Sequence, residues 1–100
     1  MDRPELVVGR HRVDLGEVYN RMYEESRTAD DGRRIHDRGL KYLLSRMYGL
    51  HADSGTPGPT LLVMRREVAS ALSELGWIAP MRRNNGRYEL LRSPVDRGAG

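Results

Sequence analysis

Apolar residues between positions 60 and 76 recur at intervals of three and four, the spacing of an amphipathic helix. At about 100° per residue they share one face, formed by Leu61, Met64, Val68, Leu72 and Leu75. We expect Thr60 to cap this helix, although the run TLLVM is also compatible with a strand that gives way to a helix near Arg65. Gly76 is expected to end the helix, because glycine readily takes the left-handed conformation found there.

Residues 77–92 predict a β-hairpin directly after this helix. Trp77 and Ile78 return the chain to the core, and Asn85-Gly86 separates two strand-like runs. Asn-Gly is a strong hairpin signal, since both residues tolerate positive φ. The hairpin also concentrates cations, with four arginines and a single acid, Glu89.

The first third of the chain predicts a short strand and a helix. We expect a strand over residues 5–13 that could pair with the hairpin, followed by Asp14 as an N-cap with Glu17 in a capping-box position. The helix is expected to end near Arg27, and its apolar stripe is Leu15, Val18, Tyr19 and Met22. Its outer face is acidic (Glu17, Glu24, Glu25), so we expect it to point away from nucleic acid or toward another subunit.

A second helix is predicted from about Asp31 to Leu50. Leu40, Leu43, Leu44 and Met47 form its stripe, Ile35 and His36 extend the pattern upstream, and Gly39 suggests a kink or a close helix crossing. Its cations suit either a solvated face or phosphate contact: Arg33, Arg34, Arg38, Lys41 and Arg46. Two prolines and two glycines make residues 52–59 a loop.

Length and composition indicate one domain over residues 5–92, with disordered ends at 1–4 and 93–100. The chain has 100 residues, a net charge of +3 and no cysteine, which excludes disulfides, thiol catalysis and cysteine-based zinc sites. No apolar run approaches 18 residues, so we expect neither a membrane span nor secretion, and a cytoplasmic location. Lys41 is the only lysine; the excess of arginine fits either codon bias or phosphate contact.

No constellation of catalytic or metal-binding residues stands out. His11, His36 and His51 are far apart and have no cysteine partners, and SGTPGPT lacks the Lys-Ser/Thr pair of a phosphate loop. We therefore expect neither an enzyme nor a cofactor or metal.

The run VASALSELGWI, then a basic segment, then NGRYELL resembles the end of a winged helix-turn-helix domain, as in the MarR- and PadR-like regulators. The expected fold is α+β and mainly helical, with three helices followed by a β-hairpin wing and a possible N-terminal strand. One feature differs: the break before the third helix is about eight residues, longer than the usual helix-turn-helix connection.

The resemblance implies that the helix at 60–76 lies in the major groove and that the wing at 77–92 follows the DNA backbone or minor groove. On that helix, Arg66, Ser70 and Ser73 are expected to face DNA, with Arg65 at the edge of the stripe. Further contacts are expected from the wing and from the second helix: Arg82, Arg83, Asn84, Asn85 and Arg87, and Arg33, Arg34 and Arg38.

These features predict a small bacterial or phage transcriptional regulator that binds double-stranded DNA, as a dimer through its first helix. A protein-interaction module on the same fold is the alternative, for example a phage or mobile-element inhibitor or an accessory subunit, because Leu62 and Val63 are expected to be exposed. An RNA-binding winged helix is a third possibility. Continuous positive charge over the third helix would favour nucleic acid, and a neutral apolar patch would favour protein.

Overall fold

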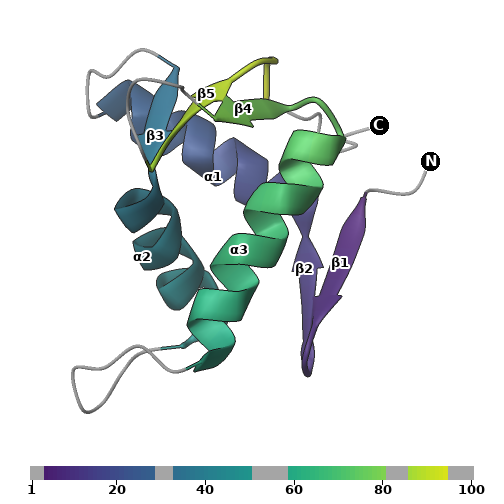
Figure 1. Ribbon diagram of the computed structural model, residues 1–100. Coiled ribbons are helices and arrows are strands. Elements are labelled where there is room, and N and C mark those ends of the chain that lie inside the picture. The colour runs from purple at the N-terminus through teal and green to yellow at the C-terminus, as the bar shows by residue number, and fades with distance from the viewer. Residues whose placement is uncertain (1–3, 29–32, 51–58, 81–85, 95–100) are drawn as a thin grey trace, which may run out of the picture.

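The first two strands form a β-hairpin of their own at the edge of the domain (Figure 1). The computed structural model describes residues 4–28, 33–50, 59–80 and 86–94. Strand β1 (Glu5–Val8) pairs antiparallel with β2 (His11–Asp14), and Gly9 turns between them with φ +60°. The expected single strand over residues 5–13, pairing with the second hairpin, is therefore wrong. The chain reverses at Gly9, where a left-handed conformation is available, and the two halves pair with each other.

Helix α1 (Leu15–Thr28) begins where the sequence predicts. The Glu17 backbone N–H donates a hydrogen bond of 3.1 Å to Oδ1 of Asp14, which confirms the N-cap. The predicted stripe is buried: Leu15, Val18, Tyr19 and Met22.

The segment before the second helix departs from the prediction. Residues Arg34–His36 form strand β3, and helix α2 (Asp37–Tyr48) begins only at Asp37. A helix start near Asp31 is therefore wrong, because Ile35 packs from a strand that pairs with β5, opposite Tyr88. A Cβ on Gly39 would lie 3.3 Å from Cγ1 of Ile35, so the close approach at this glycine is to β3.

Helix α3 (Pro59–Glu74) has the predicted buried stripe apart from its last member. It starts at Pro59, so Thr60 lies inside the helix and is not its cap. Gly76 has φ +76°, its N–H donates to the Ser73 carbonyl, and the Trp77 N–H donates to the Leu72 carbonyl. This arrangement is the Schellman motif, and it confirms the predicted helix end. Leu75 was expected to be buried, but it is 43% exposed because the helix has already ended.

The predicted second hairpin is confirmed in its pairing. Strands β4 (Ile78–Pro80) and β5 (Arg87–Leu90) are antiparallel, and β3 joins on the other side of β5 to give the order β3-β5-β4. Asn85 of the expected Asn-Gly turn lies outside the described residues.

After β5 the chain is anchored on α1. The Tyr19 hydroxyl donates to the Arg92 carbonyl at 2.7 Å and accepts from the Arg92 N–H at 3.0 Å. The Arg92 guanidinium lies 4.7 Å from the ring centroid of Trp77, which itself packs edge-on against Tyr19. Residues up to 92 therefore belong to the folded domain. Of the ends expected to be disordered, 1–4 and 93–100, residues 1–3 and 95–100 lie outside the described residues, and the Pro4 carbonyl accepts a hydrogen bond from the Leu15 N–H.

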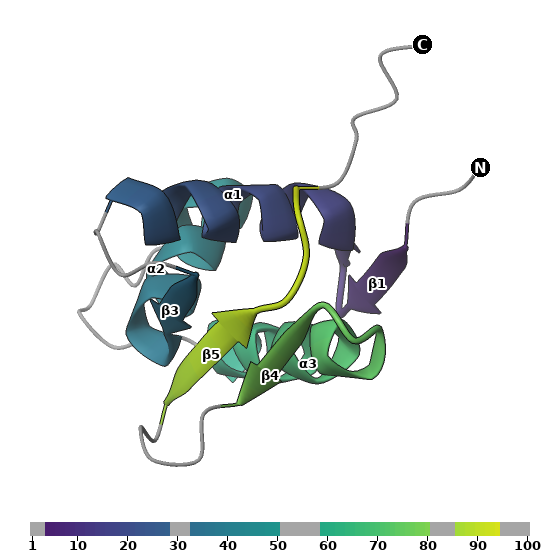
Figure 2. The ribbon, with the colours of Figure 1, turned by 90° about the horizontal axis from the view of Figure 1, so that it is seen from above.

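The described residues form an α+β domain with one hydrophobic core. Figure 2 shows α1 and α3 on opposite sides, with β4 and β5 beside α3. All three helices and both sheets contribute fully buried side chains, including Val13, Val18, Leu40, Leu44, Met64, Leu72, Ile78 and Leu90. No helix in the described ranges has both the length and the apolar character needed to cross a membrane.

Candidate nucleic-acid interface

Helix α3 has an exposed face with two chemically different flanks. Leu62, Arg66 and Ser73 lie four and seven residues apart on one flank, and all three are exposed. Glu67 and Glu74 lie about 100° and 80° around the helix from Arg66, both in the same direction. The acidic side chains are thus separated from the arginine flank, although they alternate with it in the sequence.

A hollow of about 300 Å³ separates α3 from the β4–β5 hairpin. Its lining contains every α3 residue that the sequence marked as a candidate, together with an alanine and two hairpin residues: Arg65, Arg66, Ala69, Ser70, Ser73, Pro80 and Tyr88. The structure therefore brings the candidate residues of the third helix together beside the end of the hairpin strands nearest the turn.

A second hollow, of about 250 Å³, lies between α3 and the start of α2. Its lining is His36, Asp37, Arg38, Lys41, Leu62 and Arg65. Arg65 borders both hollows, so the two lie next to each other along α3. Arg38, predicted as a phosphate contact, is exposed here, and Lys41 adds a second cation one turn further along α2.

Arg65 is tied to α2 by an ion pair. Its guanidinium lies 2.7 Å from Oδ2 of Asp37, and the two side chains are 28% and 26% exposed. The Tyr88 hydroxyl donates toward the same carboxylate. The pKa of Tyr88 is raised to about 12, mainly because the side chain is buried and secondly because the negative Asp37 carboxylate lies beside it. Oδ1 of Asp37 is buried and has no hydrogen-bond partner among the described residues. Arg65 therefore acts within the domain as a link between α3, α2 and β5.

The start of α2 also holds the hairpin in place. The His36 side chain caps the helix, with Nδ1 accepting from the Arg38 N–H at 3.1 Å. The Gly86 carbonyl accepts from the Asp37 N–H, and a Cβ on Gly86 would lie 3.3 Å from Nε2 of His36. Because Gly86 immediately precedes β5, this contact sets where the hairpin lies relative to α2 and α3.

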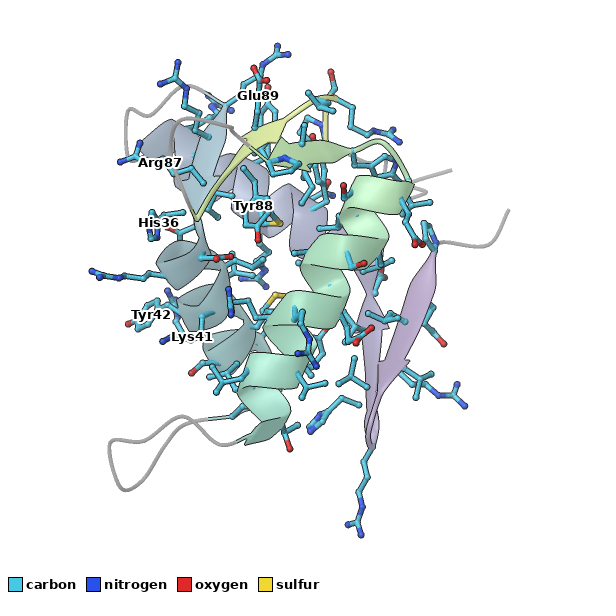
Figure 3. All side chains as sticks on the ribbon, in the orientation of Figure 1. His36, Lys41, Tyr42, Arg87, Tyr88 and Glu89 are labelled. Carbon is cyan, nitrogen blue, oxygen red and sulfur yellow. The ribbon has the colours of Figure 1, made fainter. Side chains whose placement is uncertain are left out.

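The remaining arginine candidates lie on a different surface. Strand pairing places Arg34 opposite Glu89 and His36 opposite Arg87. Because side chains alternate along a strand, these four lie on one face of the sheet, and Ile35 and Tyr88 lie on the other. Figure 3 shows Tyr88 pointing toward α3, with Arg87 and His36 on the other side of β5. Arg33 is exposed just before β3, and Arg82, Arg83, Asn84 and Asn85 lie outside the described residues.

Sequence reasoning did not select three residues of this site, His36, Asp37 and Tyr88, and it gave Lys41 only as one of the second helix's cations, suited to a solvated face or to phosphate contact. The helix expected from about Asp31 includes His36, whereas in the structure His36 is the N-cap of α2. The acidic Asp37 directly after it is the signal that could have indicated a helix start there. Asp37 and Tyr88 reach Arg65 only through the tertiary fold, so no local pattern marks them. No family model, curated protein or solved structure matches this chain.

Proposed function

We propose that the chain is a small winged helix-turn-helix protein that binds double-stranded DNA as a bacterial or phage transcriptional regulator. The observation that carries the proposal is the charge around the exposed flank of α3. Among the described residues, the two hollows beside this flank are lined by four arginine or lysine side chains and one carboxylate. The carboxylate, Asp37, is paired with Arg65, which leaves Arg38, Lys41 and Arg66 to attract phosphates.

The dimensions of α3 suit a major groove. An α-helix with its side chains is about 10–12 Å across, and the major groove is about 12 Å wide. Arg66 lies on the exposed flank, where its guanidinium can donate two hydrogen bonds to a guanine edge, and Ser70 and Ser73 follow it toward the hairpin. Arg38 and Lys41 on α2 would then contact the backbone beside the groove, as would the wing arginines Arg82, Arg83 and Arg87.

The position of α1 is compatible with this orientation. Figure 2 shows α1 on the side of the domain opposite α3, so its exposed Glu24 and Glu25 would not meet the phosphates bound by α3. The sequence expectation of a dimer through α1 would use the same side, where Arg21, Glu24, Glu25, Leu43, Arg46 and Met47 line a hollow of about 470 Å³. In this proposal the acidic helix is kept away from DNA.

The test is fluorescence anisotropy with labelled random-sequence duplex DNA, titrated from low to physiological salt. We expect micromolar binding at low salt that weakens steeply as salt rises. Arg66→Ala should weaken binding and lower the slope of log K against log salt by about 1 if Arg66 contacts a phosphate.

Arg27→Ala is the matched control. It removes the same charge from α1, where Arg27 is exposed and does not line the hollow expected at the dimer contact. Because total charge changes equally, a loss of affinity confined to Arg66→Ala assigns binding to α3. Equal effects of the two substitutions, or no binding by the parent at low salt, would reject the proposal.

A protein-interaction module is the second candidate, favoured by one observation. Leu62 and Val63, on the exposed part of α3, are 43% and 37% exposed. If the parent fails to bind DNA, the expectation is a protein partner whose capture is lost in Leu62→Asp and retained in Arg66→Ala. Retention of the partner by Leu62→Asp would reject this candidate.

A further inference from the structure

Strand β1 has an open edge. It pairs with β2 on one side, and the described strand pairings place no strand on the other. Figure 1 shows β1 at the margin of the molecule, with β2 along one of its edges, and β1 also packs against α3. An unpaired strand edge presents a row of backbone N–H and C=O groups that can pair with another chain.

The register of the first hairpin shows which residues face this edge. Val8 and His11 flank a two-residue turn, so in an antiparallel hairpin they form a hydrogen-bonded pair. Hydrogen-bonding direction alternates along a strand, so Val8 and Leu6 direct their backbone groups toward β2. Glu5 and Val7 therefore direct theirs toward the open edge.

Two protections of an edge strand, a bulge and an inward-pointing charge, are missing from β1. Its pairing with β2 is continuous over four residue pairs without a bulge, and the inner face carries Leu6 and Val8, with no inward charge. Val7 on the outer face is 63% exposed, although it is one of the strongest strand formers. A Leu-Val-Val run at an open edge is a feature that a partner strand would cover.

We propose that β1 pairs antiparallel with β1 of a second copy of this chain, about a two-fold axis at Val7. In this register Val7 lies opposite Val7 of the second copy, and Glu5 lies opposite its Gly9. Glu5 and Val7 are the residues of β1 whose backbone groups face the edge, so the hydrogen bonds between the copies are centred on the Val7 pair. Pro4, which has no N–H, ends the pairing immediately before Glu5.

The side chains support a second copy as the partner through charge complementarity. With Glu5 opposite Gly9 of the second copy, the adjacent residue is Arg10 of that copy, and both Glu5 and Arg10 are exposed. The two-fold axis repeats this Glu5–Arg10 pair on the other side, as a self-complementary interface requires. The product is a four-stranded sheet, β2-β1-β1-β2, which is more stable than an isolated two-stranded hairpin.

This dimer is expected to be weak. Pairing of about five residues per chain buries much less than the roughly 800 Å² per partner of a standard interface. We expect a dissociation constant on the order of 10–100 µM, measurable by sedimentation equilibrium over ~5–500 µM protein. The inference does not depend on DNA binding, because mass alone is the readout.

A charge exchange tests the register. Glu5→Arg places two arginines beside each other at both symmetry-related contacts, and Arg10→Glu places two glutamates there. Each variant alone should dimerise at least about tenfold more weakly than the parent, because opposed like charges destabilise paired strands. An equimolar mixture of the two variants restores an opposite-charge pair at both contacts and should dimerise as the parent does.

A backbone variant tests the pairing itself. Val7→Pro removes the N–H that faces the open edge and leaves the β1–β2 hydrogen bonds in place, so dimerisation should be lost. Val7→Thr keeps the N–H and the branched shape, and should dimerise like the parent; circular dichroism checks that both variants fold. A parent that stays monomeric throughout this range, or a dimer unaffected by Val7→Pro and by the charge variants, would overturn the proposal. The second outcome would move the contact to another surface, such as α1.

Discussion

The link from Asp37 to Arg65 should make a measurable contribution to the stability of the domain. Asp37→Ala removes the carboxylate and leaves the Arg65 guanidinium, only 28% exposed, without its partner at 2.7 Å. Exposed ion pairs contribute about 0.2–1 kcal/mol, whereas removing one partner of a buried pair costs about 3–5 kcal/mol. Since this pair lies between those limits, we expect a cost of about 2 kcal/mol.

Arg65→Ala should cost less, about 1 kcal/mol. The carboxylate it leaves behind lies in the first turn of α2, where the helix dipole favours a negative charge. If the two side chains interact as the structure shows, the double substitution should cost about 1 kcal/mol less than the sum of the single ones. Two results are therefore expected separately: Asp37→Ala costs more stability than Arg65→Ala, and the double substitution costs less than the sum of the two.

Urea denaturation followed by circular dichroism measures all three variants, and thermal unfolding provides a check. For a domain of this size about 1 kcal/mol corresponds to roughly 4–8 °C in Tm, so Asp37→Ala should lower Tm by about 10 °C. Arg38→Ala is the control, because Arg38 lies in the same turn but is exposed, and its cost should stay below about 0.5 kcal/mol. Additive single and double variants, or an equal loss in Arg38→Ala, would refute the argument.

Two further predictions concern the hairpin. The pKa of Tyr88 is raised from 10.0 to about 12, so its stabilising effect is complete below pH 10 and is lost as the pH rises toward 12. Tyr88→Phe should therefore reduce the alkaline loss of stability, measured as urea midpoints from pH 8 to 12, although Tyr19 and Tyr48 also have raised pKa values and will keep part of it. Replacing Arg82, Arg83 and Arg87 with alanine should weaken duplex DNA binding at every sequence and lower the salt slope by up to about 3; unchanged affinity and slope would make the wing assignment wrong.

The sequence correctly predicted those elements that are specified by residues close together in the chain. The stripe from Leu15 to Met22 and the cap at Asp14 identified α1, and Gly76 marked the end of α3. The hairpin followed from two strand-like runs separated by turn residues. Each of these depends on spacings shorter than about ten residues, which a single sequence displays directly.

The elements that were missed depend on partners far along the chain. Strand β3 has only three residues, and its apolar Ile35 also fits the helical period of the stripe that begins at Leu40. It becomes a strand because β5, more than fifty residues later, supplies its hydrogen bonds. A spacing pattern cannot distinguish these outcomes, since both bury Ile35.

The same distinction applies to the candidate site. The helical period predicted that Arg66, Ser70 and Ser73 are exposed together, and they line one hollow. It also placed Arg65 at the edge of the buried stripe, but it gave no sign of Asp37 or Tyr88 as neighbours. Exposure is a local property of a helix, whereas the partner of a half-buried charge is decided by which elements pack beside it.

This difference changes how the charge of α3 should be counted. Taken alone, the helix has two arginines and two glutamates and is neutral, which is a weak basis for binding DNA. In the folded domain Arg65 is neutralised by Asp37, and Glu67 and Glu74 lie on the other flank. Arg38 and Lys41 of α2 line a hollow with Leu62, which shares the exposed flank of α3 with Arg66. Because a phosphate responds to the cations within about a Debye length, the relevant charge is that of the surface shared by α2 and α3. If the proposed function holds, a substitution on α2, such as Lys41→Ala, should therefore affect DNA binding as strongly as one on α3 itself.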